Sequence, residues 1–265
     1  MHDKIMELYE HTAFLEMKRW QLKVSRKPSI ASRLSRKLQR KVNEVIPEKV
    51  HVAITNAIKQ MVRAVLFGSE ITTNKVLHGL SLEQREKLVQ ERVEFYKRTA
   101  AVEGGVTGAG GLLLGLADFP LLLGLKIKLQ FEIAAIYGYD VSDVRERLYI
   151  LHIFQLAFSN QQHRREVYNH IIDWQNNYEK LPRNMDDFNW RTFQQEYRDY
   201  IDLAKLAQLI PVIGAAVGLV VNYRLVTRLG ETAMNAYRMR WFNQLPSQTS
   251  PRTTDSPSSS TYPRK

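Results

Sequence analysis

Apolar side chains recur every three or four residues along most of the chain. This spacing gathers them on one face of an α-helix. One such face is formed by Ile30, Leu34, Leu38, Val42 and Val45. We find no convincing run of the strict alternation that is typical of β-strands. The pattern therefore predicts an all-α protein.

Capping residues and prolines predict where the helices begin and end. Pro47 stops the first helix and opens the next over residues 48–66, which Gly68 closes as a C-cap. Ser81 precedes a long helix over residues 82–102, and Ser142 with Asp143 opens another. The remaining helices are expected at residues 161–178, 189–209 and 212–242.

Two segments are rich in glycine and apolar residues rather than amphipathic. Residues 104–124 hold seven glycines around a Leu-rich run, and residues 209–221 read LIPVIGAAVGLVV. Glycines four apart lie on one helix face, where they let a neighbouring backbone approach. Such pairs are Gly104 and Gly108, Gly111 and Gly115, and Gly214 and Gly218. We expect both segments to be helical and to pack together at the centre of a compact multi-helix domain.

Asp118 is the one carboxylate inside the first Gly-rich segment. It precedes Phe119 and Pro120, and an aspartate there accepts hydrogen bonds from the free N–H groups of a helix that starts next. We therefore interpret Asp118 as the N-cap of a helix over residues 120–137, at a corner of the chain. The alternative is a functional carboxylate in an apolar pocket, which would have a raised pKa.

The composition is that of a basic globular protein without cysteine. The 265 residues carry a net charge of +11 and no cysteine, which excludes disulfides, thiol catalysis and Cys-ligated metals. Residues 1–100 hold 20 basic and 11 acidic side chains, so +9 of the charge lies there. A charge of this sign suits an anionic partner.

The basic segment over residues 18–49 is open to three interpretations. It is a solvated helix that packs its apolar stripe on the core, a membrane-surface element, or a nucleic-acid surface. Few aromatic residues interleave with the cations, so we do not expect nucleic acid as the partner. The candidate membrane-surface residues are Lys23, Arg26, Lys27, Arg33, Arg36, Lys37, Arg40 and Lys41.

The sequence offers no catalytic, cofactor or metal motif. The Gly-rich segment lacks the GxxxxGK pattern of phosphate loops, and neither HExxH nor GxSxG is present. His163, Glu166 and His170 share a helix face, which we interpret as an exposed charged surface. We expect no catalytic residue, no cofactor and no metal ligand.

The start of the chain lacks the pattern of a signal peptide. Residues 106–125 are long enough to span a membrane, but Asp118 and Pro120 interrupt them. We therefore expect a cytoplasmic protein, either soluble or held at the inner face of the cell membrane.

Three blocks of the sequence resemble the EcsC family, which is named for the third product of a bacterial operon that encodes an ABC transporter. They are residues 103–120, 121–140 and 210–242. The positions that match the family pattern are Gly104, Gly108, Gly111, Asp118, Pro120, Pro211, Gly214, Gly218 and Asn222. The resemblance implies a mostly helical bacterial protein without an established activity, with an ABC transporter as partner at the cytoplasmic membrane face.

These observations predict one helical EcsC-like domain over residues 1–245, with a basic amphipathic region at 1–46, and a disordered tail at 246–265. The leading hypothesis is a non-enzymatic protein at an anionic membrane face, accessory to an ABC transporter or to export. One alternative is an enzyme acting on a lipid or apolar substrate with Asp118 as acid or base. Another is an integral membrane protein with residues 106–125 as a re-entrant hairpin. The sequence does not give the oligomeric state.

Overall fold

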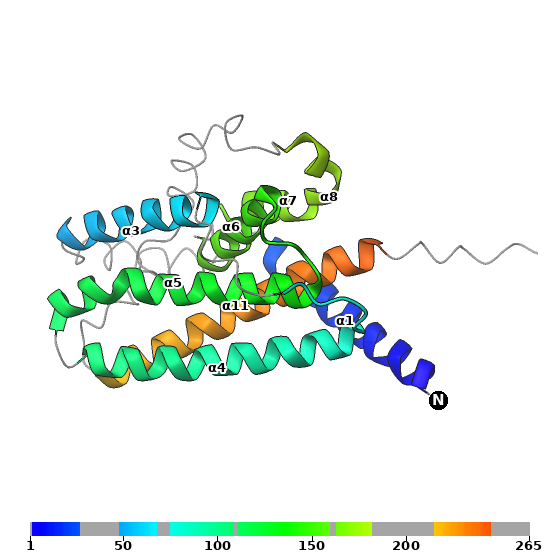
Figure 1. The fold of residues 1–265 in the computed structure, drawn as a ribbon, viewed down its shortest axis with the longest axis horizontal. Coiled ribbons are helices and arrows are strands. Elements are labelled where there is room, and N and C mark those ends of the chain that lie inside the picture. The colour runs from blue at the N-terminus through cyan, green and yellow to red at the C-terminus, as the bar shows by residue number, and fades with distance from the viewer. Residues whose placement is uncertain are drawn as a thin grey trace, which may run out of the picture.

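The computed structural model describes residues 2–26, 48–67, 75–108, 111–159, 163–181 and 215–244 (Figure 1). Every regular element in these ranges is helical, so the predicted all-α class is confirmed. The elements are α1 (His2–Ser25), α3 (Glu48–Phe67), α4 (Leu82–Gly108), α5 (Gly111–Tyr137), α6 (Val144–Phe158), α7 (Arg164–Ile172), α8 (Trp174–Asn177), the 3-10 helix η1 (Tyr178–Lys180) and α11 (Ala215–Gln244).

Helices α4, α5 and α11 form the middle of the molecule (Figure 1). α4 and α5 run antiparallel as a hairpin, and α11 packs along α4 and also touches α5. α3 covers α5, α6 contacts both α3 and α11, and α1 lies across α11 and α7. Buried apolar side chains from all of these helices join in one cluster.

Two of the predicted helix starts have the expected caps. The Ser81 hydroxyl accepts a hydrogen bond from the Gln84 N–H at 3.3 Å, and the Gln84 side chain accepts one from the Ser81 N–H at 3.0 Å. This reciprocal capping box opens α4. The Asp143 carboxylate accepts from the Arg145 N–H at 2.9 Å and opens α6. Both starts follow from residues within one helical turn.

The predicted corner at Asp118 is wrong. α5 is continuous from Gly111 to Tyr137 and contains Pro120 in its interior. Proline inside a helix costs about 3 kcal/mol. The buried residues that follow pack α5 against α3 and α4, and this packing offsets the local cost. Asp118 is therefore inside a helix and is not an N-cap.

The Gly-rich stretch lies where the α4–α5 hairpin turns. Gly104 and Gly108 are in the last turns of α4, and Gly111 opens α5. Gly218 is near the start of α11, whereas Pro211 and Gly214 lie outside the described residues. Helices α4 and α5, which carry the first segment, pack against α11, which begins within the second segment; a contact between the two segments themselves stays a prediction.

The closest approach of a described glycine to a neighbouring helix is at Gly230, which the sequence analysis did not single out. A Cβ added to Gly230 of α11 would lie 2.6 Å from Cγ2 of Val93 in α4. A glycine is therefore needed where these two helices cross.

The predicted helix over residues 161–178 is broken into α7, α8 and η1. The break at Asp173 allows Trp174 to bury its indole against the Tyr149 ring, with centroids 4.9 Å apart. The helices expected at residues 30–45 and 189–209, the Gly68 C-cap and the tail at 246–265 lie outside the described residues.

The Gly230 contact predicts opposite effects for two equivalent substitutions. Gly230→Ala should lower the free energy of unfolding by about 1–3 kcal/mol, because the new methyl group overpacks against Val93. Gly124→Ala, whose Cβ would meet nothing within 4 Å, should raise it by up to about 1 kcal/mol. Urea unfolding measures both. Equal effects would contradict the close approach.

Candidate functional site

Two carboxylates in the core are paired with arginines of α11. Glu86 of α4 is 0% exposed and meets Arg238, which is 6% exposed. Glu146 of α6 is 3% exposed and meets Arg240, which is also 6% exposed. Removing charges from water costs several kcal/mol per ion, so such pairs need close geometry and further hydrogen bonds.

Glu86 has both of its oxygens fully engaged. Arg238 donates to Oε1 through Nε and to Oε2 through a terminal nitrogen, each at 2.6 Å. The Tyr137 hydroxyl donates to Oε1 at 3.1 Å and the Tyr9 hydroxyl to Oε2 at 2.8 Å. A carboxylate has about four acceptor sites, and four donors occupy them here. Glu86 therefore holds helices together through its four hydrogen bonds.

The same cluster holds α1 on the body of the protein. Tyr9 binds Glu86, and Glu16 accepts a hydrogen bond from Arg238 at 2.9 Å. Burial, and then the adjacent Glu86, raise the pKa of Tyr9 above its usual value. Burial alone would lower the pKa of Arg238, but the hydrogen bonds and charge of Glu86 raise it. Both groups therefore stay protonated at neutral pH.

The second pair is surrounded by aromatic rings. Arg240 donates to Glu146 Oε2 at 2.6 Å, and the Tyr237 hydroxyl donates to Oε1 at 2.6 Å. The guanidinium of Arg240 lies 3.5 Å from the ring centre of Tyr139 and 4.7 Å from that of Tyr149. Cation–π contact with these faces partly replaces lost hydration. The arrangement joins α6 to α11.

Two further buried arginines bind carbonyl oxygens instead of carboxylates. Arg85 donates to the carbonyls of Ile136, Leu77 and Leu80. Arg147 donates to the carbonyls of Val141, Leu66 and Val65. Ile136 and Leu66 lie in the last turns of α5 and α3, where carbonyls lack partners in their own helix. These arginines therefore close helix ends inside the protein.

Asn222, one of the family-pattern residues, is completely buried between α11 and α5. Its Oδ1 lies 3.3 Å from Nζ of Lys126, which is 1% exposed and also donates to the Leu122 carbonyl at 3.2 Å. The sequence analysis did not select Lys126. Lys126 follows a run of leucines in the sequence, and this apolar context could have indicated that its side chain is buried. The contact gives Asn222 an architectural role.

The histidines of the predicted exposed face do not meet at one point. His163 Nδ1 lies 2.8 Å from Glu166, whereas the His170 ring stacks on that of His152 with centroids 5.2 Å apart. Burial, and then the nearby His170, lower the pKa of His152 to about 3. Within the described ranges, no three His, Asp or Glu side chains are grouped as metal ligands.

Helix α1 exposes leucines on the face that points away from the body. Leu8, Leu15 and Leu22 are 66%, 42% and 64% exposed. Residues seven apart share one helix face, so these leucines form a single line, which we call the leucine stripe. The opposite face, with Ala13 and Met17, is buried. The leucine stripe is therefore an apolar surface that the described fold leaves exposed, and exposed apolar surfaces often mark interaction sites.

Cations border the leucine stripe. Arg19 and Arg26 follow Leu15 and Leu22 by four residues, and Lys23 follows Arg19 by four. All three are exposed. Lys23 and Arg26 belong to the candidate membrane-surface set. The other members, Lys27, Arg33, Arg36, Lys37, Arg40 and Lys41, lie outside the described residues.

None of the helices in the part of the chain that the structure describes combines the length and apolar character that crossing a bilayer requires.

The fold and its ion pairs define an all-α protein whose charged core joins helices that are distant in sequence. The EcsC protein family model matches residues 11–242, and the chain belongs to this family. It is 45% identical over 222 residues to Protein EcsC of Bacillus subtilis, covering 83% of this chain and 91% of that protein. It is 32% identical over 143 residues to the uncharacterized protein YdbA of the same organism, covering 53% and 52%. No solved structure matches.

Because Glu86 is buried and paired with Arg238, we expect the loss of this arginine to lower the free energy of unfolding strongly. Arg238→Met should lower the free energy of unfolding by about 3–5 kcal/mol, because it leaves a buried carboxylate without its counter-ion. The matched control is Arg98→Met, which removes a 79% exposed arginine lying 3.7 Å from the 43% exposed Glu94 and should cost less than about 1 kcal/mol. Chemical denaturation measures both. A similar cost for the two would contradict the assignment.

The lowered pKa of His152 predicts that the free energy of unfolding decreases as the pH falls. Its pKa of about 3 in the folded protein lies below the value of about 6.5 in an unfolded chain. Between these values the unfolded state binds the proton and the folded state does not, so acid favours unfolding. His152→Gln should therefore flatten the loss of stability between pH 7 and pH 4. Identical slopes in wild type and variant would show that His152 is not responsible.

Proposed function

We propose that the protein is a peripheral protein of an anionic membrane face, which it contacts through α1. The observation that carries the proposal is the exposed leucine stripe bordered by Arg19, Lys23 and Arg26. A helix that lies in the membrane interface needs an apolar line for the acyl region and cations for the headgroups. α1 has both on the side that faces away from the core.

The magnitudes support weak and reversible attachment. The exposed parts of the three leucines together equal fewer than two whole side chains, and burying them contributes about 3 kcal/mol at about 1.5 kcal/mol per leucine, the lower end of the range for this residue. Three cations near an anionic leaflet contribute about 1 kcal/mol each. The sum of about 6 kcal/mol is similar to the affinity of one myristoyl chain, which binds membranes reversibly. The basic segment that the sequence analysis emphasised would add to this attraction.

Charge favours a lipid surface over a second copy of the chain as the occupant of the stripe. If two copies paired through their leucine stripes, the bordering cations of one would face those of the other, and like charges repel. Nucleic acid would satisfy the cations but would leave the leucines in water. An anionic bilayer satisfies both sets of side chains.

The family resemblance implies an ABC transporter as the partner at this face, and we include it in the proposal. Contacts with a transporter would add to those with lipid. Affinity should then be higher for vesicles that contain the transporter than for protein-free vesicles of the same lipid composition.

Flotation with liposomes tests the attachment. Wild-type protein should float with vesicles that contain phosphatidylglycerol and remain behind with neutral vesicles. The combined substitution Arg19→Glu, Lys23→Glu and Arg26→Glu should weaken binding by roughly 100-fold or more, because each removed cation contributes about 1 kcal/mol. Reversal of Lys75, Arg98 and Arg224, which are exposed on other elements, changes the net charge equally. That control should bind like wild type.

A separate variant tests the leucine stripe, which forms the apolar part of the proposed contact. Replacing Leu8, Leu15 and Leu22 with serine should leave the fold intact, since all three are exposed, but should weaken binding to anionic vesicles about 100-fold. Equal binding by wild type and by either α1 variant would overturn the proposal. Self-association of the wild type that the serine variant abolishes, without any vesicle binding, would assign the stripe to a second copy of the chain instead.

A further inference from the structure

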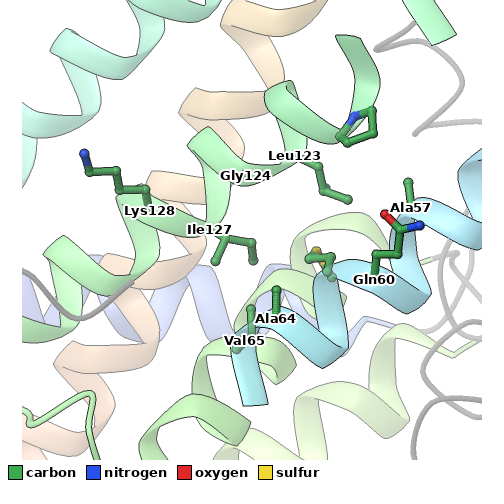
Figure 2. Close-up of a pocket in the computed structure, with 10 residues that line it drawn as sticks. Ala57, Gln60, Ala64, Val65, Leu123, Gly124, Ile127 and Lys128 are labelled. Atoms are coloured by element: carbon green, nitrogen blue, oxygen red, sulfur yellow. The ribbon is translucent and has the colours of Figure 1, made fainter. Parts of the chain in front are cut away.

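A groove lies between α3 and α5, on elements other than α1 (Figure 2). Its volume is about 510 Å³, which is within the range of ligand pockets. Most of the side chains that line it are apolar or small. They include Ala57, Met61 and Ala64 of α3 and Leu123, Gly124 and Ile127 of α5.

Gly124 provides the free space in the wall of this groove. A Cβ built on Gly124 would have no atom within 4 Å, which is the opposite of the crowded site at Gly230. Figure 2 shows Ile127 of α5 directed toward Ala64 and Val65 of α3, and Leu123 directed toward the part of α3 that carries Gln60. An apolar chain laid along the groove would therefore contact side chains of both helices.

The charge at the edge of the groove comes from Lys128 of α5. Among the described side chains of α3 and α5, the exposed charged groups are the cations Lys59, Arg63 and Lys128. Glu132, the acid of these two helices with a described side chain, is buried and accepts a hydrogen bond from Tyr96 at 2.7 Å. Of these cations Lys128 lines the groove, whereas the helical spacing places Lys59 and Arg63 on the face of α3 turned away from the lining residues. No described carboxylate lines the groove.

Lys128 offers both apolar contact and positive charge at one edge of the groove. Its side chain lines the groove, and it extends away from α3 so that the ammonium group lies outside (Figure 2). Long basic side chains often cover apolar surface with their methylene groups while the charge stays in water. Gln60 on the opposite wall adds an exposed amide that can donate a hydrogen bond.

We infer that the α3–α5 groove binds one acyl chain of an anionic amphiphile, with the chain between the helices and the anionic head at Lys128. The apolar lining, the open space at Gly124 and the cation Lys128 at the edge together select this class of ligand. A neutral apolar molecule would not use Lys128, and a polar anion would not use the lining. The site is separate from the leucine stripe, so its test needs no membrane.

Titration with cis-parinaric acid, a fluorescent fatty acid, in the absence of vesicles tests the inference. Wild-type protein should bind it saturably with one molecule per chain. Gly124→Leu should weaken binding by at least about tenfold, because the side chain fills the groove. The fold should tolerate it, since the site is open and leucine favours helix. The matched control Gly124→Ala should bind within about twofold of wild type, because a methyl group leaves most of the space.

Reversing the charge at position 128 tests the proposed contact between Lys128 and the anionic head group of the ligand. Lys128→Glu should weaken binding of the fatty acid by about tenfold and leave binding of its methyl ester unchanged, because the ester carries no charge to lose. A parallel titration with lysophosphatidylglycerol below its micelle concentration separates a phospholipid source from a free fatty acid, according to which binds more tightly. Absence of saturable binding of either, or equal binding by wild type and Gly124→Leu, would overturn the inference.

Discussion

The ion pair between Glu86 and Arg238 is the interaction on which the rest of the structure depends. It joins α4 to α11 across 152 positions of sequence, and it reaches α5 through Tyr137 and α1 through Tyr9. An unpaired charge in this position would destabilise the fold, so all four helices must be in place together. The pair thus also fixes which face of α1 is turned inward. The outward position of the leucine stripe follows from that contact.

Features that depend on neighbouring residues could be predicted from the sequence. The all-α class follows from the apolar period, and the starts of α4 and α6 follow from caps within one turn. Pro120 was misjudged because a local rule was applied where long-range packing decides. The ion pairs could not be predicted, since nothing in the sequence links Glu86 to Arg238. Glu86 shares a helix face with Leu82 and Val89, which indicates burial but not a partner.

The exposed surface of α1 also could not be predicted from the sequence alone. The candidate membrane-surface residues lie in a basic segment that is mostly outside the described residues, and two of them, Lys23 and Arg26, are exposed at the end of α1. The sequence analysis did not find the leucine stripe. α1 is apolar on two faces, so its apolar residues do not gather on one side and give no clear amphipathic signal. Only the packing of Ala13 and Met17 shows which face remains exposed.

The membrane contact that we propose for α1 can be tested directly because the chain has no cysteine, so a single one can be introduced for labelling. A nitroxide attached to Leu15→Cys reports its surroundings by electron paramagnetic resonance in the presence of phosphatidylglycerol vesicles. Our account predicts that this label becomes more accessible to oxygen and less accessible to a water-soluble relaxing agent when vesicles are added. A label at Arg224→Cys on α11 should not change. If the label at position 15 stays as exposed to water as the label at position 224, the leucine stripe does not enter the membrane interface and the account is contradicted.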